Sequence, residues 1–189
     1  MSTPAGEFYT EERWDNWLDR LRSTELDPSD EDSARLLLNL QDDVAIAVAK
    51  IVSAAEDELG EGAALEELGG IRDIVLGPVE IEDEETAILV DGVQTSLVAV
   101  FFAAEQYVAD GVTDDESVEA YLRDACEAEQ AEEFDEALQL TGNAGTQVID
   151  GEALDIAVLE EFEYGLVTEW TNGLDSLQSA LSDPEVIEE

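Results

Sequence analysis

Residues 36–55 read LLLNLQDDVAIAVAKIVSAA, and apolar side chains recur in this stretch at steps of three or four residues. Because an α-helix completes a turn in about 3.6 residues, such steps place these side chains along one face of a helix. We expect the helix to extend from about residue 30 to residue 57. The apolar face is wide enough to predict a helix at the centre of a core. Its members are Leu37, Leu40, Val44, Val48, Ile51 and Ala55, widened by Leu36, Ala45, Ala47 and Ala49.

The same helical period recurs along the rest of the chain. It predicts long helices over residues 83–109 and 154–181, whereas the two-residue alternation typical of strands is nowhere convincing. Four shorter helices fit the same pattern and are separated mostly by glycine, proline or polar turns. The sequence therefore predicts an all-α fold, an antiparallel helical bundle of about seven helices. The four shorter helices are expected near residues 11–26, 64–76, 114–128 and 132–149.

Capping residues and internal glycines indicate where the helices begin and how they pack. Thr10, Ser29 and Thr113 are expected to cap helix N-termini, since a short polar side chain can accept a hydrogen bond from a free main-chain N–H. Three glycines fall inside helical patterns, where glycine costs about 1 kcal/mol relative to alanine. We expect close approach of two helices at these positions, which are Gly92, Gly165 and Gly173.

The length of the chain suits one domain with a substantial core. We expect a single helical domain over residues 10–181, preceded by a flexible N-terminus at 1–9 and followed by an acidic C-terminal tail at 182–189. Residues 42–62 also align without a gap with residues 91–111. A duplicated helical hairpin would explain this similarity, and so would chance matching between two helices built from few residue types.

Acidic residues dominate the charged part of the composition. The chain has 50 Asp and Glu against 7 Lys and Arg, which gives a net charge of −43, and Lys50 is its single lysine. On a sphere of about 18 Å radius, that charge has an electrostatic self-energy of about 70 kcal/mol near 0.1 M salt and about 30 kcal/mol near 1 M. Even a quarter of the first value exceeds the ~5–15 kcal/mol that keeps a domain folded. The composition therefore predicts a halophilic protein adapted to molar salt.

Intrinsic disorder and mimicry of nucleic acid are also associated with high negative charge, but the sequence suits neither. Disorder is typical of highly charged chains with few apolar residues, whereas 44% of this chain is apolar. A mimic of nucleic acid would concentrate its charge, whereas acidic residues here occur in every part of the chain. Nucleic acid is also an unfavourable partner, because the sequence offers no basic patch to neutralise phosphates. We therefore expect neither disorder nor nucleic-acid binding.

The residue types that are missing exclude several kinds of chemistry. The chain has no histidine, which removes Ser-His-Asp and Cys-His catalysis and histidine-ligated zinc. Its one cysteine, Cys126, cannot form an internal disulfide and suits a reducing cytoplasm. The first residues lack the basic and apolar regions of a secretory signal, and the longest uncharged apolar stretch, 93–104, is too short to span a membrane. We expect a cytoplasmic location and no membrane partner.

Five carboxylates form the pattern EExxE…ExxD. This pattern resembles the magnesium-binding signature of all-α nucleoside-triphosphate pyrophosphohydrolases. The resemblance implies that carboxylates on adjacent helices would hold Mg²⁺, which binds the substrate phosphates and activates water. In a chain with 50 acidic residues such patterns also arise by chance, so this Mg²⁺-dependent enzyme is the alternative to a function without catalysis or cofactor. The five residues are Glu132, Glu133, Glu136, Glu152 and Asp155.

Polar side chains interrupt the two most apolar predicted helices. Gln41, Asp42, Asp91 and Gln94 fall among apolar residues, and a buried polar group without a partner is costly. One interpretation is a buried, satisfied hydrogen-bond network between the helices, or exposure at a helix edge. The other interpretation is a polar pocket or a cation site.

Three arginines, Arg13, Arg20 and Arg22, flank the two tryptophans of the first predicted helix. Arg13, Trp14, Trp17 and Arg20 combine residue types that are enriched at protein–protein hot spots, and they form the predicted interaction surface. The alternative is ordinary packing of the tryptophans into the bundle, with each arginine paired to a nearby carboxylate.

Five short segments form a recognisable set. They are ERW at 12–14, LNLQDDV at 38–44, LVDGVQ at 89–94, VIDG at 148–151 and EYGLV at 163–167. Together they resemble a family of small, highly acidic haloarchaeal proteins known as a domain of unknown function. The resemblance extends over nearly the whole chain and implies its source and a single domain. It carries over no active-site residue.

These features favour a non-catalytic protein–protein interaction or scaffold module. The long apolar faces and the helix rich in Trp and Arg are the observations behind this hypothesis. The expected partner is an unknown protein or a second copy of the chain.

Overall fold

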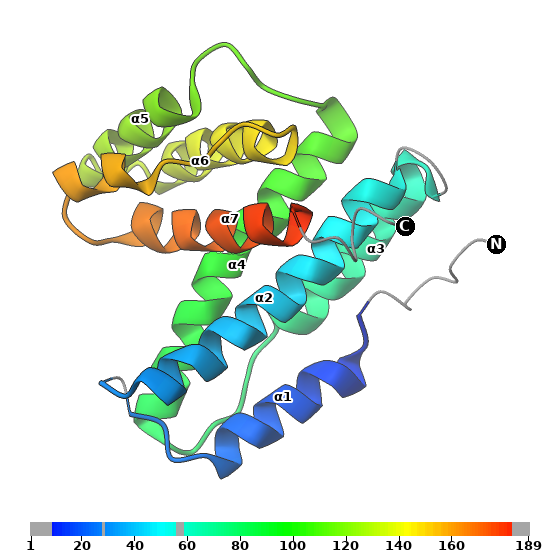
Figure 1. Ribbon diagram of the computed structural model, residues 1–189, viewed down its shortest axis with the longest axis vertical. Helices are drawn as coiled ribbons and strands as arrows, with labels where there is room; N and C mark the ends of the chain where they lie inside the picture. Colours follow the sequence, from blue (N-terminus) through cyan, green and yellow to red (C-terminus); the bar gives the residue numbers. More distant parts are fainter. Residues whose placement is uncertain (1–8, 28, 56–58, 183–189) are drawn as a thin grey trace.

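A computed structural model describes residues 9–27, 29–55 and 59–182 (Figure 1). Within these residues the chain forms seven α-helices and one short 3-10 helix, and no strand. The prediction of an all-α fold with about seven helices is therefore confirmed. The elements are α1 (Glu11–Ser23), α2 (Glu31–Ala54), α3 (Glu61–Val75), α4 (Glu84–Asp110), α5 (Val118–Gln130), α6 (Phe134–Ile149), η2 (Ile156–Glu161) and α7 (Leu166–Leu181).

The predicted end segments fall almost entirely outside the described residues. Of the predicted flexible N-terminus at 1–9, the structure describes Tyr9, which is 3% exposed and belongs to the hydrophobic core. Of the predicted acidic tail at 182–189, it describes Ser182, which follows the last turn of α7. The folded part of the chain thus includes Tyr9.

Helix α4 lies at the centre of the molecule and is shared by two hydrophobic clusters (Figure 1). The first cluster joins α4 to α1, α2 and α3, with Leu40 and Leu97 among its fully buried members. The second joins α4, through Ala99, to α5, α6 and the first part of α7. The end of α7 belongs to the first cluster through Leu177 and Ala180. Because α4 is buried on more than one side, it lacks the single apolar stripe of a surface helix.

The helices combine antiparallel pairs with one parallel pair. Short connections make α2 antiparallel to α3, and α5 antiparallel to α6 (Figure 1). Residues 150–165 then return the chain to the start of α6, so α7 runs parallel to α6. Two contacts fix this direction: the Val167 N–H donates to Glu129 Oε1 at 2.7 Å, and Gln178 donates to the Glu152 carbonyl at 3.1 Å. Helix α4 crosses both α6 and α7.

The helix predicted over residues 154–181 is two elements, so this part of the prediction is wrong. The 3-10 helix η2 ends at Glu161, and α7 begins at Leu166. Between them, Gly165 is extended and forms the N-cap of α7, and a Cβ there would collide with the Glu129 carboxylate of α5. That carboxylate accepts a hydrogen bond from the first turn of α7, which has no side-chain cap of its own. A contact between distant residues therefore sets where α7 starts.

Three helices begin at a residue whose side chain caps the N-terminus, and for two of them this residue differs from the predicted one. Thr10 caps α1, as predicted. Helix α2 is capped by Asp30 instead of Ser29, and α5 by Ser117 instead of Thr113. In each case a side-chain oxygen accepts a hydrogen bond from a main-chain N–H in the first turn.

Helices approach closely at glycine, but mostly at positions other than those predicted. Gly173 of α7 faces the Ser96 carbonyl of α4 with no room for a Cβ, as expected. Gly92 has open space around it, so the prediction is wrong there. Gly142 and Gly145 of α6 pack against α4 too closely to accept a Cβ without movement of the neighbouring side chains.

The two segments that align in sequence adopt different arrangements. Helix α2 packs mainly against α7 and α4, and it also packs against the helix that follows it, α3. Helix α4 packs mainly against α7 and α6, and the helix that follows it, α5, packs against α6. The similarity therefore does not correspond to two equivalent hairpins.

Helix α4 is long and apolar enough, by length and composition alone, to cross a membrane. An 18-residue window within Glu84–Asp110 has a mean hydropathy of 1.8, and half of that window is buried inside the fold. The central helix of a folded core meets the same criterion, and α4 has that position here. The absence of a membrane partner stays a prediction.

Candidate functional site

The five carboxylates of the EExxE…ExxD pattern lie at both ends of α6. Glu132 and Glu133 form the turn before this helix, and Glu136 lies in its first turn. Glu152 follows the other end of α6, which has 16 residues and is therefore about 24 Å long. Asp155 caps η2. In the described part of the chain, no group of three or more Asp, Glu or Cys side chains is arranged to hold a metal ion, so the structure does not bring the five together.

The four polar residues of the apolar helices have different surroundings. Gln41 donates to Ser176 Oγ at 2.8 Å and so joins α2 to α7. Gln94 donates to two carbonyl groups at the end of α3, at 2.8 and 3.0 Å. Asp42 is half-buried and Asp91 is exposed. The two glutamines thus bond between helices at separate places, and the four residues do not form one network.

Asp43 of α2 holds α1 against the rest of the fold. Arg13 contacts both carboxylate oxygens, with Nε 2.7 Å from Oδ2, and Trp17 Nε1 donates to Oδ2 at 3.0 Å. The Arg13 guanidinium also lies 5.8 Å from the centre of the Tyr9 ring. Burial, together with the nearby Asp43 charge, raises the pKa of the Tyr9 hydroxyl well above its usual value. One carboxylate therefore engages Arg13 and Trp17, two of the four residues predicted to form an interaction surface.

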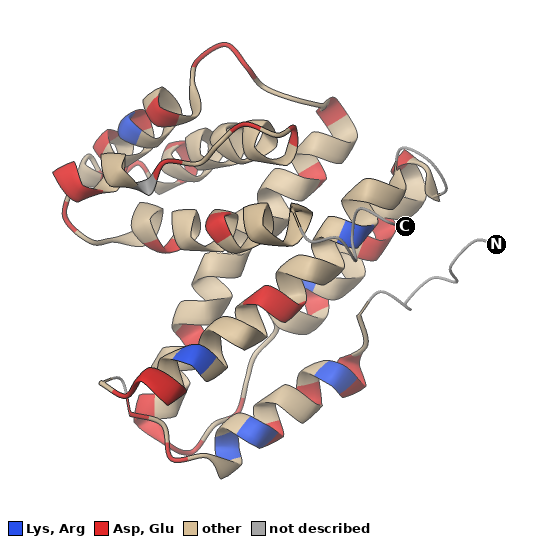
Figure 2. Cartoon of the chain, viewed as in Figure 1, with Lys and Arg blue, Asp and Glu red and all other residues tan. Residues whose placement is uncertain are grey.

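Two residues of that predicted surface, Trp17 and Arg20, form a stacked pair on α1, and Arg13 is exposed as well. Trp14 is buried in the first cluster, with 3% of its surface exposed. Trp17 is half-buried, and the exposed Arg20 lies over its ring with Cζ 5.4 Å from the centre. Figure 2 shows most of the basic residues on α1, α2 and α3 of an otherwise acidic molecule. Helix α1 thus presents an aromatic ring with a cation stacked on it.

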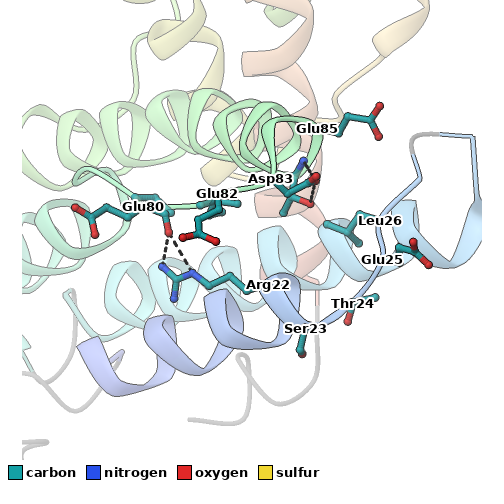
Figure 3. A pocket seen from close by; sticks show the side chains of 12 residues that line it. Arg22, Ser23, Thr24, Glu25, Leu26, Glu80, Glu82, Asp83 and Glu85 are labelled. Carbon is teal, nitrogen blue, oxygen red and sulfur yellow. Dashed lines mark hydrogen bonds between the residues drawn. The ribbon is translucent and has the colours of Figure 1, made fainter.

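A cleft of about 1280 Å³ lies beside the C-terminal end of α1 (Figure 3). Residues 22–26, which end α1 and follow it, form one wall. Residues 79–83, 85 and 86, which belong to the linker to α4 and to the start of α4, form the other. Arg22 connects the two walls by donating from Nε and Nη2 to the Glu80 carbonyl, at 3.1 and 2.8 Å. The acidic residues of the lining are Glu25, Glu80, Glu82, Asp83 and Glu85.

The linker wall of this cleft has a strand-like pattern. Residues 79–82 read VEIE, and the half-buried Val79 and Ile81 alternate with the exposed Glu80 and Glu82. Such alternation is typical of an extended chain, whose successive side chains point to opposite sides. In the described part of the chain, the main chain of these four residues makes no hydrogen bond other than the two that the Glu80 carbonyl accepts from Arg22. Sequence reasoning missed this feature, because four alternating residues are too few to stand out from chance.

A second group that the sequence did not indicate is a cluster of amide side chains beside α6. Gln106 of α4 donates to Asn143 at 2.8 Å and to Thr113 at 3.1 Å. Gln139 donates to both Gln106 and Asn143, and Gln147 donates to two carbonyl groups of the loop after α4. These amides bond to one another and to the loop, so they fix the loop against α6.

Cys126 is buried in α5 beside Glu129. Burial raises the pKa of its thiol to about 11, and the Glu129 charge acts in the same direction. The thiol therefore stays protonated near neutral pH, which does not suit a nucleophile.

Comparison with known proteins identifies a family. No curated protein and no solved structure matches the chain. The family described as an uncharacterized protein conserved in archaea, DUF2150, matches residues 7–189. This match includes all of the helices, the stacked pair on α1 and the cleft beside it. The chain therefore belongs to the DUF2150 family of archaeal proteins.

Proposed function

We propose that this protein is a non-catalytic interaction module of the cytoplasm of a halophilic archaeon, and that it docks a partner protein through α1. The observation that carries the proposal is the stacked pair that the half-buried Trp17 and the exposed Arg20 form on α1. The archaeal family and the net charge of −43 support the halophilic source.

The stacked pair is held in place before any partner arrives. The hydrogen bond from Trp17 Nε1 to Asp43 restricts the ring, and the ring in turn restricts the guanidinium of Arg20. A preorganised side chain loses little conformational entropy when it becomes part of an interface. Tryptophan and arginine are also the residue types that contribute most at hot spots. This part of α1 is therefore suited to be the centre of a docking surface.

Molar salt makes such a surface effective in a highly acidic protein. The screening length falls to about 3 Å at 1 M salt, so the charge of −43 does not repel an acidic partner from a distance. Apolar packing and direct hydrogen bonds then decide whether the partner binds. The carboxylate pattern of the alternative Mg²⁺-dependent enzyme has no comparable support, since its members lie at both ends of α6.

A photocrosslinking amino acid at Asn16 tests the proposal. Asn16 is exposed on α1, one turn before Arg20, and the same crosslinker at the exposed Glu119 of α5 is the control. In cells or in lysate with 2–3 M KCl, we expect a defined adduct from position 16 that position 119 does not give. The substitution Arg20→Ala should weaken that adduct several-fold, whereas Glu12→Ala on the same helix should not.

The mass of the adduct shows whether the partner is another protein or a second copy of the chain. An absence of adducts from position 16, or the same adducts from both positions, would overturn the proposal.

A further inference from the structure

We infer that the cleft beside α1 receives an extended segment of the partner protein that carries lysine or arginine, and that this segment pairs with residues 79–82 as an added strand. The inference rests on the proposed function and names the chemistry of the partner. It is drawn from the main chain of the linker, the positions of its side chains and the hollow beside it.

The main chain of residues 79–82 is available for pairing. Val79 and Ile81 pack partly against the first hydrophobic cluster, which holds the linker in place. Apart from the Glu80 carbonyl, which accepts from Arg22, the main-chain groups of these four residues have no hydrogen-bond partner within the described residues. An unpaired extended segment is a template for strand addition, in which main-chain hydrogen bonds supply affinity. The cleft of about 1280 Å³ gives a second chain room to lie along it.

The side chains of the linker define what the added segment must carry. Glu80 and Glu82 both line the cleft and are two residues apart, which separates them by about 6.7 Å in an extended chain. Basic residues that are also two apart on an added strand would lie opposite both carboxylates at once, and opposite charges paired across strands are favourable. A segment with adjacent basic residues would present only every second one to the linker.

Arg22 shows that this wall of the cleft accepts a guanidinium. Its Nε and Nη2 groups both donate to the Glu80 carbonyl, and Figure 3 shows it reaching from α1 toward the linker. The chain also contains one basic pair with the required spacing, Arg20 and Arg22, but both lie within α1. A second copy could offer this pair in an extended form only by unfolding its own α1. The structure therefore favours a different protein as the source of the segment.

Acidic lining alone would not single out this cleft, because acidic residues are spread over the whole chain. The distinguishing features are the alternation of residues 79–82 and their unpaired main chain. In molar salt the long-range attraction between the acidic surface and any basic peptide is screened. A peptide that still binds at 2 M KCl therefore binds through direct contacts between its side chains and those of the linker that lie opposite them.

The test measures peptide binding to the full chain by fluorescence anisotropy in 2 M KCl. The probe is a ten-residue peptide of alternating lysine and threonine, and its control has the same composition with the lysines consecutive. We expect the alternating peptide to bind about tenfold more tightly. Glu80→Gln combined with Glu82→Gln should remove most of this preference. Glu160→Gln combined with Glu163→Gln, which makes the same charge change at two exposed positions elsewhere, should leave it unchanged.

A third peptide tests the main-chain pairing directly. N-methylation of the threonines removes N–H donors without changing charge, and we expect it to weaken binding about as much as the double substitution at Glu80 and Glu82. The inference is overturned if the alternating peptide does not bind, if both lysine spacings bind equally, if N-methylation has no effect, or if the control variant loses the same affinity. None of these results alters the crosslinking from position 16, so the two proposals fail separately.

Discussion

Glu132 illustrates how a single residue can satisfy a sequence pattern and have another role in the fold. Its φ of 61° makes it the one non-glycine residue with positive φ in the described part of the chain. Glu132 follows the end of α5. The Glu132 N–H donates to the Glu129 carbonyl, and the Glu133 N–H donates to the Ala128 carbonyl, both at 2.9 Å. These two bonds define a Schellman turn, in which the left-handed residue is usually glycine. The carboxylate of Glu132 is therefore incidental to this role.

Replacing Glu132 by glycine should stabilise the protein. Glycine adopts the left-handed conformation without steric cost, so we expect the free energy of unfolding to rise by about 0.5–1 kcal/mol. Thermal unfolding in 2 M KCl, followed by circular dichroism, measures the change. Glu127→Gly removes the same side chain from an exposed position inside α5 and should instead cost about 1 kcal/mol. Equal destabilisation by both variants would contradict the turn geometry.

The roles of single residues can be predicted where the partner is close in sequence. The Thr10 cap is such a case, because its partner N–H is three residues away. Asp43 gives no sign in the sequence that it anchors α1, because its partners Arg13 and Trp17 lie 30 and 26 residues before it. The cap that Glu129 provides for α7, 38 residues later, is hidden for the same reason. Contacts of this kind depend on how whole helices pack, which local spacing does not record.

At the scale of helices, apolar periodicity predicts where a helix lies better than it predicts the residues at which a helix begins and ends. The period over residues 83–109 predicts α4 to within a residue at each end. The same method runs η2 and α7 together, because Leu159 and Phe162 continue the apolar spacing across the break at Gly165. It also gives no information on direction, so the parallel order of α6 and α7 could not be predicted. That order follows from the return of residues 150–165 along the molecule.

The packing of α7 on α4 can be tested with two glycines that both lie inside helices. Gly173→Ala places a Cβ against the Ser96 carbonyl, a main-chain atom that cannot move freely, and should destabilise the protein by about 2–3 kcal/mol. Gly92→Ala meets nothing nearby and should stabilise it by up to about 1 kcal/mol, because alanine is the better helix former. Denaturant unfolding in 2 M KCl gives both values. Similar effects of the two substitutions would contradict the close approach of the helices.

At the scale of the whole molecule, the charged side chains lie on the surface and the core is made mainly of apolar side chains, as in other globular proteins. Glu67 is the one buried residue among the acidic residues that the structure describes. The core is built from leucine, isoleucine, valine, alanine and a few aromatic side chains, in two clusters that share α4. The fold class could be predicted because it depends on this apolar pattern. The partner could not, because the acidic background makes any one carboxylate motif uninformative.

The surface charge should make folding depend on salt. We expect the melting temperature to rise continuously between 0.1 and 3 M KCl, and the chain to lose helical structure at the low end, because screening lowers the repulsion among the carboxylates. Circular dichroism measures helix content, and the fluorescence of the buried Trp14 and Trp170 reports on both clusters. Sucrose strengthens apolar burial without screening charge. An equal rise of the melting temperature in sucrose alone would contradict screening as the cause.

The end of α7 completes the cluster that the first helices begin. Gln41 bonds to Ser176, which lies 135 residues later, and Leu177 and Ala180 cover apolar side chains of that cluster. During translation, α1, α2 and α3 therefore leave the ribosome long before the residues that bury them exist. The N-terminal half must wait with part of its apolar surface uncovered. Native packing of the first cluster is thus an event that follows the synthesis of α7.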